Sequence, residues 1–159
     1  AGAALDGSHG EVHAPEIHII PLGLFAAMKH KEFYLYGEDY PTKDGSCVRD
    51  YIHIEDLCQA HLLALDALKN GHKTDVYNVG TGTGITNKEV IAQIKRETGV
   101  DFPVVVKARR AGDPGQLVAD PTRIKKEFGW SPQHSDIAII VSTAWKWHKN
   151  NPKGYANRD

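Results

Sequence analysis

Arginines beside predicted strand ends are the residues of this sequence best suited to hold a charged ligand. Arg49 stands in SCVRDYIH, and Arg109, Arg110 and Asp113 stand in KARRAGDP. Because a guanidinium group presents a rigid fork of donors, arginines on separate loops could clamp a phosphate or a pyrophosphate. An exposed arginine is more often only a surface salt-bridge partner, so both interpretations stay open. These residue types favour a polyphosphate or nucleotide ligand.

A second candidate is the glycine-rich segment VYNVGTGTGITNKEVI, in which Gly80, Gly82 and Gly84 alternate. A dinucleotide fingerprint needs G-x-G-x-x-G between a strand and a helix, with an acidic residue about 20 positions later. The spacing here is G-x-G-x-G, and Asp101 precedes a Phe-Pro pair rather than ending a strand. We therefore expect a tight turn rather than a cofactor cradle, although the start of the following helix could still face a ligand.

Metal and nucleophile chemistry has less support in the residue pattern. His9, His13 and His18 are close in sequence, but no cysteine accompanies them and no predicted helix fixes two imidazoles on one face, so we expect no metal site. No serine stands in a G-x-S-x-G elbow. The spacing of Cys47 and Cys58 fits neither a redox pair nor a zinc pattern, which favours reduced structural thiols.

Length and composition indicate an ordinary globular protein. The 159 residues suffice for one domain, and 41% hydrophobic residues, 25% charged residues and a net charge of -1 imply no basic surface for nucleic acid. The apolar runs are far shorter than the roughly 20 residues of a membrane span, and no signal peptide is visible. We expect a cytoplasmic protein without membrane contact. Because Ala1 is not Met, we also expect a fragment of a longer protein.

Hydrophobic periods and turn residues predict alternating helices and strands, which is typical of the α/β class. The predicted helices cover residues 17–28, 55–68, 86–98, 121–128 and 136–148. The predicted strands cover residues 33–36, 48–54, 76–79 and 103–107, with a hairpin-like excursion over 37–46. About the first 16 residues are expected to form a loop, and about the last eight a frayed tail.

Two helix starts have recognisable caps. Thr86-x-x-Glu89 is a capping box, and Glu55 or Asp56 is expected to cap the helix that ends near Leu68. The apolar stripe of that second helix comprises Leu57, Ala60, Leu63, Ala64, Ala67 and Leu68.

Five blocks then stand in a characteristic order: HAPEIHIIPL (13–22), YLYGEDYPTKDGSCVRDYIHIEDL (34–57), VYNVGTGTG (76–84), RRAGDP (109–114) and FGWSPQ (128–133). Together they resemble the C-terminal half of the UDP-glucose 4-epimerase family, over nearly the whole chain. The DYPTKDGS and VRDYIH blocks are the most specific among sugar-nucleotide relatives of the short-chain dehydrogenases.

The resemblance implies a two-domain isomerase of galactose metabolism that interconverts UDP-glucose and UDP-galactose and works as a homodimer. In such an enzyme an N-terminal Rossmann half binds NAD and carries a Tyr-x-x-x-Lys pair, and the C-terminal half binds the UDP-sugar. None of the six tyrosines here has a lysine four positions later, and no G-x-x-G-x-x-G is present. We therefore expect residues 1–159 to be the UDP-sugar-binding domain, without catalytic residues or an NAD site and inactive alone.

Carried over residue by residue, the resemblance implies ten substrate-binding residues: His18, Ile19, Tyr34, Tyr36, Arg49, Tyr51, Asn87, Arg110, Asp113 and Leu117. Arg49 and Arg110 would contact the pyrophosphate, and Asp113 the uridine ribose. Tyr51 would lie beside Arg49 in the same pocket. Asn87 would lie near the uracil.

The remaining residues of that set would surround the base and the sugar. Tyr34 and Tyr36 would line the uracil with backbone groups, and His18 and Ile19 would be a pair of substrate contacts. Leu117 matches a gate position where a bulky tyrosine restricts some relatives to the plain hexose. A leucine there would leave room for an N-acetyl hexose.

Two alternatives remain beside the epimerase. One is a non-catalytic nucleotide-sugar-binding or partner module, and the other is a related sugar-nucleotide dehydratase or decarboxylase, which would also use Arg49. If the epimerase interpretation is right, the strand around residues 51–54 joins the sheet of the missing half. The chain alone would then expose apolar surface and an unpaired strand edge.

Overall fold

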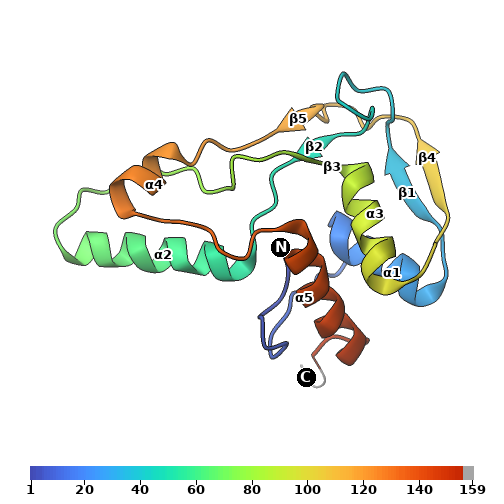
Figure 1. The fold of residues 1–159 in the computed structure, drawn as a ribbon, viewed down its shortest axis with the longest axis horizontal. Coiled ribbons are helices and arrows are strands. Elements are labelled where there is room, and N and C mark those ends of the chain that lie inside the picture. The colour runs from blue at the N-terminus through green and yellow to red at the C-terminus, as the bar shows by residue number, and fades with distance from the viewer. Residues whose placement is uncertain (156–159) are drawn as a thin grey trace.

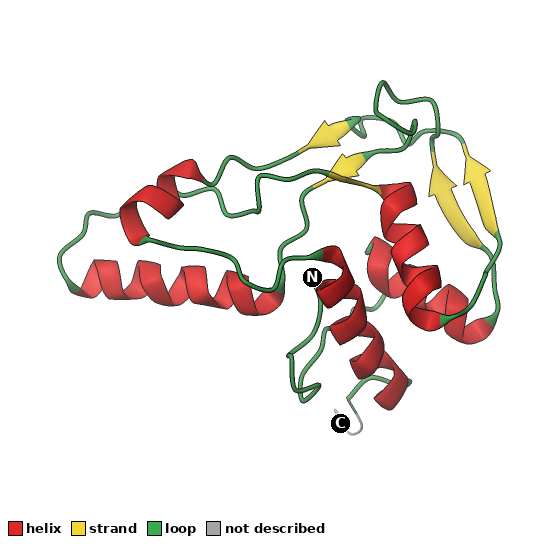
Figure 2. Cartoon of the chain, viewed as in Figure 1, coloured by secondary structure: helices red, strands yellow, loops and turns green. Residues whose placement is uncertain are grey.

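The computed structural model describes residues 1–155, and in that part it contains five α-helices and five short β-strands (Figure 1, Figure 2). In chain order these are α1 (Ile19–Lys29), β1 (Phe33–Tyr36), β2 (Val48–Arg49), α2 (Ile54–Lys69), β3 (Ile85–Thr86), α3 (Asn87–Thr98), β4 (Val104–Lys107), β5 (Gln116–Leu117), α4 (Thr122–Phe128) and α5 (Ile137–Asn150). Helices and strands are interspersed, which confirms the α/β class. Within the described residues, no helix is both long and apolar enough to cross a bilayer.

The main hydrophobic core lies where α1, α3 and α5 pack together beside the β1–β4 pair (Figure 1). Its fully buried members are Leu24, Val90, Ile94, Ile140 and Val141. A smaller cluster of Ala60, Ile124 and Trp130 joins α2 to α4 at the far end of the molecule. Long segments without regular structure connect the two ends (Figure 2).

The strands form two separate small sheets. β1 pairs in parallel with β4, whereas β2 lies between β3, which is antiparallel to it, and β5, which is parallel to it. The turn residues 37–46 therefore connect two sheets. The segment closes on itself as the predicted hairpin-like excursion would, because the Tyr40 N–H donates to the carbonyl of Gly45 (2.9 Å).

Two predicted strands are shorter than expected or missing. Of residues 48–54 only Val48–Arg49 form a strand, and residues 76–79 form none. A β-strand requires a hydrogen-bonded neighbour, and none of residues 1–155 pairs as a strand with residues 50–54 or 76–79. Instead, the amino group of Ala1 donates to the carbonyl of Ile52, and the Ile54 N–H donates to the carbonyl of Ala1. Val76 in the other segment is 82% exposed.

Side-chain acceptors determine where α1 and α3 begin. The Thr86 hydroxyl accepts from the Glu89 N–H (3.1 Å) and the Glu89 carboxylate accepts from the Thr86 N–H (2.9 Å), which confirms the predicted capping box. α1 begins at Ile19, two residues later than expected, and the carboxylate of Glu16 accepts the N–H groups of the two residues before it, Ile17 and His18, each at 2.8 Å.

α2 is capped by a residue that the sequence did not predict. Nδ1 of His53 accepts from the Glu55 N–H (3.1 Å), so the expected cap at Glu55 or Asp56 is wrong. The carboxylate of buried Asp56 accepts from the N–H groups of Gln133 (2.8 Å) and His134 (2.9 Å). This aspartate therefore anchors the segment before α5 rather than its own helix.

The predicted apolar stripe of α2 is only partly covered. Ala60 is buried, Leu57, Leu63, Ala64 and Ala67 are partly buried, and Leu68 is exposed. Two leucines outside the predicted stripe, Leu62 and Leu65, are also about half exposed. α2 packs mainly on the short helix α4, which covers a small part of its length (Figure 1). We refer to Leu62, Leu65 and Leu68 below as the open face of α2.

The C-terminal segment is packed as far as the structure describes it. The hydroxyl of Tyr155 donates to the carbonyl of Gly10 (2.7 Å) and accepts from its N–H (3.0 Å), and the Tyr155 ring lies against Trp147. The expected frayed tail began near residue 152, so residues 152–155 belong to the described fold, and residues 156–159 lie outside it.

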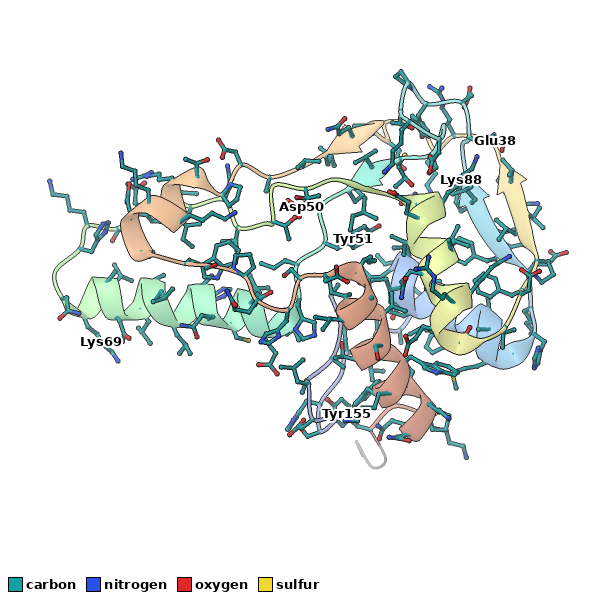
Figure 3. All side chains as sticks on the ribbon, viewed as in Figure 1. Glu38, Asp50, Tyr51, Lys69, Lys88 and Tyr155 are labelled. Atoms are coloured by element: carbon teal, nitrogen blue, oxygen red, sulfur yellow. The ribbon has the colours of Figure 1, made fainter. Side chains whose placement is uncertain are left out.

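The glycine-rich segment is held from beneath by Asp50 (Figure 3). The Asp50 carboxylate accepts from the Thr81 N–H (2.9 Å), the Thr81 hydroxyl (2.6 Å) and the Gly82 N–H (3.0 Å). These N–H groups are the ones that a phosphate cradle would direct at its ligand. Because a carboxylate of the chain already occupies them, the prediction of a tight turn is confirmed.

The three alternating glycines have separate structural reasons. Gly82 has φ of 81°, in the left-handed region that favours glycine. Gly80 and Gly84 lie against neighbouring segments, so that a Cβ on Gly80 would come within 2.6 Å of Asp50, and one on Gly84 within 2.4 Å of Val48. The turn therefore passes too close to β2 for any larger side chain.

A methyl group at position 84 tests this packing. Gly84→Ala should lower the free energy of unfolding by about 1–3 kcal/mol, because the new Cβ must displace Val48 and Val118. Gly115→Ala is the matched control, since its Cβ would meet Tyr40 at an ordinary 3.4 Å, and it should change stability by about 0.5 kcal/mol or less. Urea unfolding measures both, and equal effects would contradict the close approach.

Candidate functional site

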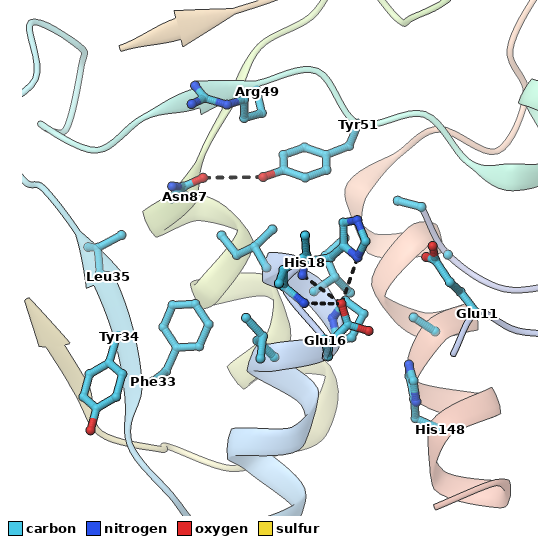
Figure 4. A pocket seen from close by; sticks show the side chains of 18 of the residues that line it. Glu11, Glu16, His18, Phe33, Tyr34, Leu35, Arg49, Tyr51, Asn87 and His148 are labelled. Atoms are coloured by element: carbon cyan, nitrogen blue, oxygen red, sulfur yellow. Dashed lines mark hydrogen bonds and ion pairs between the residues drawn. The ribbon is translucent and has the colours of Figure 1, made fainter. Parts of the chain in front are cut away.

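One cavity of about 980 Å³ collects nearly all of the predicted substrate-binding residues (Figure 4). Nine of the ten line it: His18, Ile19, Tyr34, Tyr36, Arg49, Tyr51, Asn87, Arg110 and Asp113. They come from the start of α1, from β1, from β2 and the segment after it, from the first residue of α3 and from the loop between β4 and β5. Residues up to 95 positions apart in the sequence, His18 and Asp113, thus line one cavity.

Arg49 and Asp113 form an ion pair inside this cavity. Nη1 of Arg49 donates to the carbonyls of Val48 (2.8 Å) and Pro114 (3.0 Å), and Nη2 donates to the Asp113 carboxylate. Both side chains are about one quarter exposed, so the pair is accessible to a ligand. A guanidinium has five N–H donors, and these bonds use three of them. Arg49 is thereby held in place with donors still available.

Arg110 lies against an aromatic ring rather than a carboxylate. Its guanidinium lies over the Tyr36 ring, 4.1 Å from the ring centre, and within residues 1–155 it forms no ion pair. The adjacent Arg109 instead binds Asp39 (2.7 Å) and lies over the Tyr40 ring. Of the two neighbouring arginines, Arg110 is therefore the one that lines the cavity and can meet an anion there.

Tyr51 and Asn87 meet across the upper part of the cavity (Figure 4). The Tyr51 hydroxyl donates to Oδ1 of Asn87 at 3.4 Å, a long bond. Burial raises the pKa of Tyr51 to about 12, although the charge of Arg49 acts in the opposite direction. Tyr51 is therefore a neutral phenol at physiological pH. Asn87 is fixed because its N–H donates to the carbonyl of Cys47 (2.9 Å).

β1 contributes residues from both of its faces to the cavity lining. Phe33 and Leu35 are buried in the core, whereas Tyr34 is exposed on the opposite side and carries Lys107 over its ring at 4.8 Å. The Phe33 N–H donates to the carbonyl of Pro103 in the segment of β4. Since backbone groups of successive residues in a strand point to opposite edges, those of the tyrosines point away from β4.

The N-terminal loop and α5 contribute residues that the sequence did not reveal. Glu11 and Glu16 of the loop and His148 of α5 also line the cavity. Burial raises the pKa of Glu16, but hydrogen bonds from His18 and from backbone N–H groups outweigh it and the pKa is lowered overall. Burial also lowers the pKa of His148. The only signal for Glu16 in the sequence was its place just before a helix start.

Leu117 is the predicted residue that does not line the cavity. It lies on β5 with its side chain 55% exposed, and it is the register partner of Arg49 in the parallel β2–β5 pair. Its role as a gate beside the sugar stays a prediction.

Residues 7–80 match the family model of the NAD dependent epimerase/dehydratase family. The UDP-glucose 4-epimerase of Lactobacillus helveticus is 48% identical over 159 residues, which cover 99% of this chain and 48% of that protein. The chain thus spans about half the length of the curated relatives that it matches.

Solved structures give the same result in three dimensions. A crystal structure of UDP-glucose 4-epimerase superposes with a TM-score of 0.95 at 44% identity, over 99% of this chain and 48% of the other. The enzyme of Bifidobacterium longum, solved in complex with NAD+ and UDP, superposes with a TM-score of 0.84 at 34% identity, over 97% and 46%. By sequence and by fold, this chain is homologous along nearly its whole length to the UDP-glucose 4-epimerases, of which it spans about half.

Proposed function

We propose that the chain is the UDP-sugar-binding, C-terminal half of a UDP-glucose 4-epimerase that interconverts UDP-glucose and UDP-galactose with NAD. The observation that carries the proposal is the shared cavity. Nine residues that the resemblance assigns to the substrate, from distant parts of the sequence, line the same space. Its volume of about 980 Å³ also suits a nucleotide-sized ligand, since small-molecule pockets measure about 300–1,000 Å³.

The charges in the cavity support a pyrophosphate ligand. Arg49 and Arg110 approach from separate segments, so each can contact one phosphate group. Asp113 would repel a phosphate, but the hydrogen bond from Arg49 fixes it and leaves carboxylate lone pairs for a ribose hydroxyl. Anion and hydroxyl recognition can therefore take place side by side.

The edge of β1 supports recognition of the uracil. Within residues 1–155, β1 pairs only with β4, so the backbone groups of Tyr34 and Tyr36 on its second edge are available to a ligand. An amide-like base such as uracil offers both a donor and acceptors to such an edge. The neutral Tyr51 and the side chain of Asn87 complete this part of the cavity.

The open face of α2 supports the existence of a second, NAD-binding half. Leu62, Leu65 and Leu68 expose apolar surface, and residues 76–79 are extended without a strand partner. Contiguous exposed apolar surface of this kind marks an interface. We infer that the other half of the enzyme covers this surface, holds NAD and the catalytic tyrosine and lysine, and forms the homodimer.

A UDP titration of the chain tests the binding part. Isothermal calorimetry should show one site for UDP, and Arg110→Ala should weaken it roughly 10- to 150-fold, because each charge-assisted contact contributes about 1.5–3 kcal/mol. Arg49→Ala should weaken it as well, and added salt should weaken the binding of the unaltered chain.

Arg96→Ala provides the matched control for this titration, since Arg96 is exposed on α3 and does not line the cavity. It should leave UDP binding unchanged. The proposal fails if the unaltered chain gives no heat with UDP, or if the three arginine variants bind UDP equally well.

An activity assay tests the assignment of catalysis to the other half. The chain incubated with UDP-galactose and NAD should form no UDP-glucose, because no tyrosine here has a lysine four positions later. The homologous enzyme of Lactobacillus helveticus, tested at equal concentration, is the positive control. Formation of UDP-glucose by the chain alone would refute the division of roles. Binding of UDP without turnover is the expected pattern.

A further inference from the structure

Two imidazoles and a carboxylate meet at the N-terminal loop, beside the cavity. Ligand-capable atoms of Glu11, His13 and His18 all lie within 4.8 Å of one another, on exposed side chains. Glu11 and His13 belong to the loop, and His18 is the residue before α1. We propose that these three residues bind a divalent transition-metal ion, for which Zn²⁺ is the probe.

The distances suit an ion after small side-chain rotations. Nδ1 of His13 lies 3.2 Å from Oε1 of Glu11, and the His13 and His18 rings lie 4.8 Å apart, centre to centre. In a tetrahedral zinc site with bonds of about 2.1 Å, neighbouring ligand atoms are about 3.4 Å apart. The widest pair must therefore close by about 1.4 Å, a movement that exposed side chains can make without a change in the backbone.

Glu16 holds His18 in the orientation that a metal ligand requires (Figure 4). Oε1 of Glu16 accepts from Nδ1 of His18 (2.8 Å) and from the His18 N–H (2.8 Å), and its side chain is only 8% exposed. Because a carboxylate can only accept, Nδ1 carries the hydrogen and the lone pair of Nε2 is free. A carboxylate behind a histidine in this way is the usual support of a metal ligand.

The donor set selects the kind of ion. Two imidazoles favour Zn²⁺, Ni²⁺ or Cu²⁺, whereas Mg²⁺ and Ca²⁺ prefer sites built from oxygen. Two histidines and one glutamate leave a fourth position open, as in zinc sites that keep a water molecule. Since His18 also lines the cavity, an ion bound here would engage one of the proposed substrate contacts.

The test is a titration of the tag-free chain with ZnCl₂, in a Cys58→Ser background so that the exposed thiol cannot bind zinc. Calorimetry should show one ion per chain. His13→Ala and Glu11→Gln each remove one ligand and should weaken binding more than tenfold. Glu16→Ala removes the acceptor that orients His18 while the three ligands remain, and it should weaken binding by about 10- to 100-fold at unchanged stoichiometry.

His9→Ala is the control from the same loop, exposed and outside the cluster, and should bind zinc as the parent does. A parallel titration with Co²⁺ should give the visible absorption of a low-symmetry site, lost in His13→Ala. The proposal is overturned if the parent gives no heat with ZnCl₂, or if His9→Ala weakens binding as much as His13→Ala does. Since no outcome depends on UDP, this test is independent of the proposed function.

Discussion

The carboxylate of Asp50 holds together the segments on which the cavity depends. It accepts N–H groups from Thr81, from Gly82 and, at a longer 3.3 Å, from Ala119, so three stretches of chain meet at one side chain. Successive side chains of an extended segment point to opposite sides. While Asp50 binds these loops, its neighbours Arg49 and Tyr51 line the cavity on the other side. Residues 49–51 thus hold the neighbouring segments together through Asp50 and contribute two side chains to the cavity.

Two other aspartates, Asp44 and Asp56, hold irregular segments together by accepting hydrogen bonds from them. Asp44 accepts from the N–H (2.9 Å) and the hydroxyl (2.7 Å) of Ser46 and from the Thr86 hydroxyl, and it thereby ties the 37–46 segment to the start of α3. Asp56 ties α2 to the segment before α5. Hydrogen bonds to a charged acceptor are stronger than neutral ones, so a few carboxylates can order long irregular segments.

Local chemistry made part of this fold predictable. Helices were found within a few residues of their true limits, because caps such as Thr86 with Glu89 act within one turn. Strand pairing is not local, so residues 50–54 and 76–79 had the composition of strands but no partner within residues 1–155. The stripe of α2 was recognised as apolar, yet whether it is covered depends on surfaces that the residues of the helix do not determine.

The site was predictable to a similar degree. Residue type alone indicated Arg49, Arg109 and Arg110 as possible phosphate ligands. Arg49 and Arg110 line the cavity, whereas Arg109 pairs with Asp39 outside it. Resemblance added the residues around the base and sugar. Glu11 and Glu16 were not predicted, since their place beside His18 follows from the turn of the N-terminal loop, which no spacing rule encodes.

The position of Arg49 in the β2–β5 pair couples it to the segment that ends in β5. Its guanidinium binds the carbonyl of Pro114, and its backbone is in register with Leu117 three residues later. Both ends of the segment 114–117 therefore lie against Arg49. A movement of Arg49 would therefore also move Leu117, so the positions of these two residues cannot change independently.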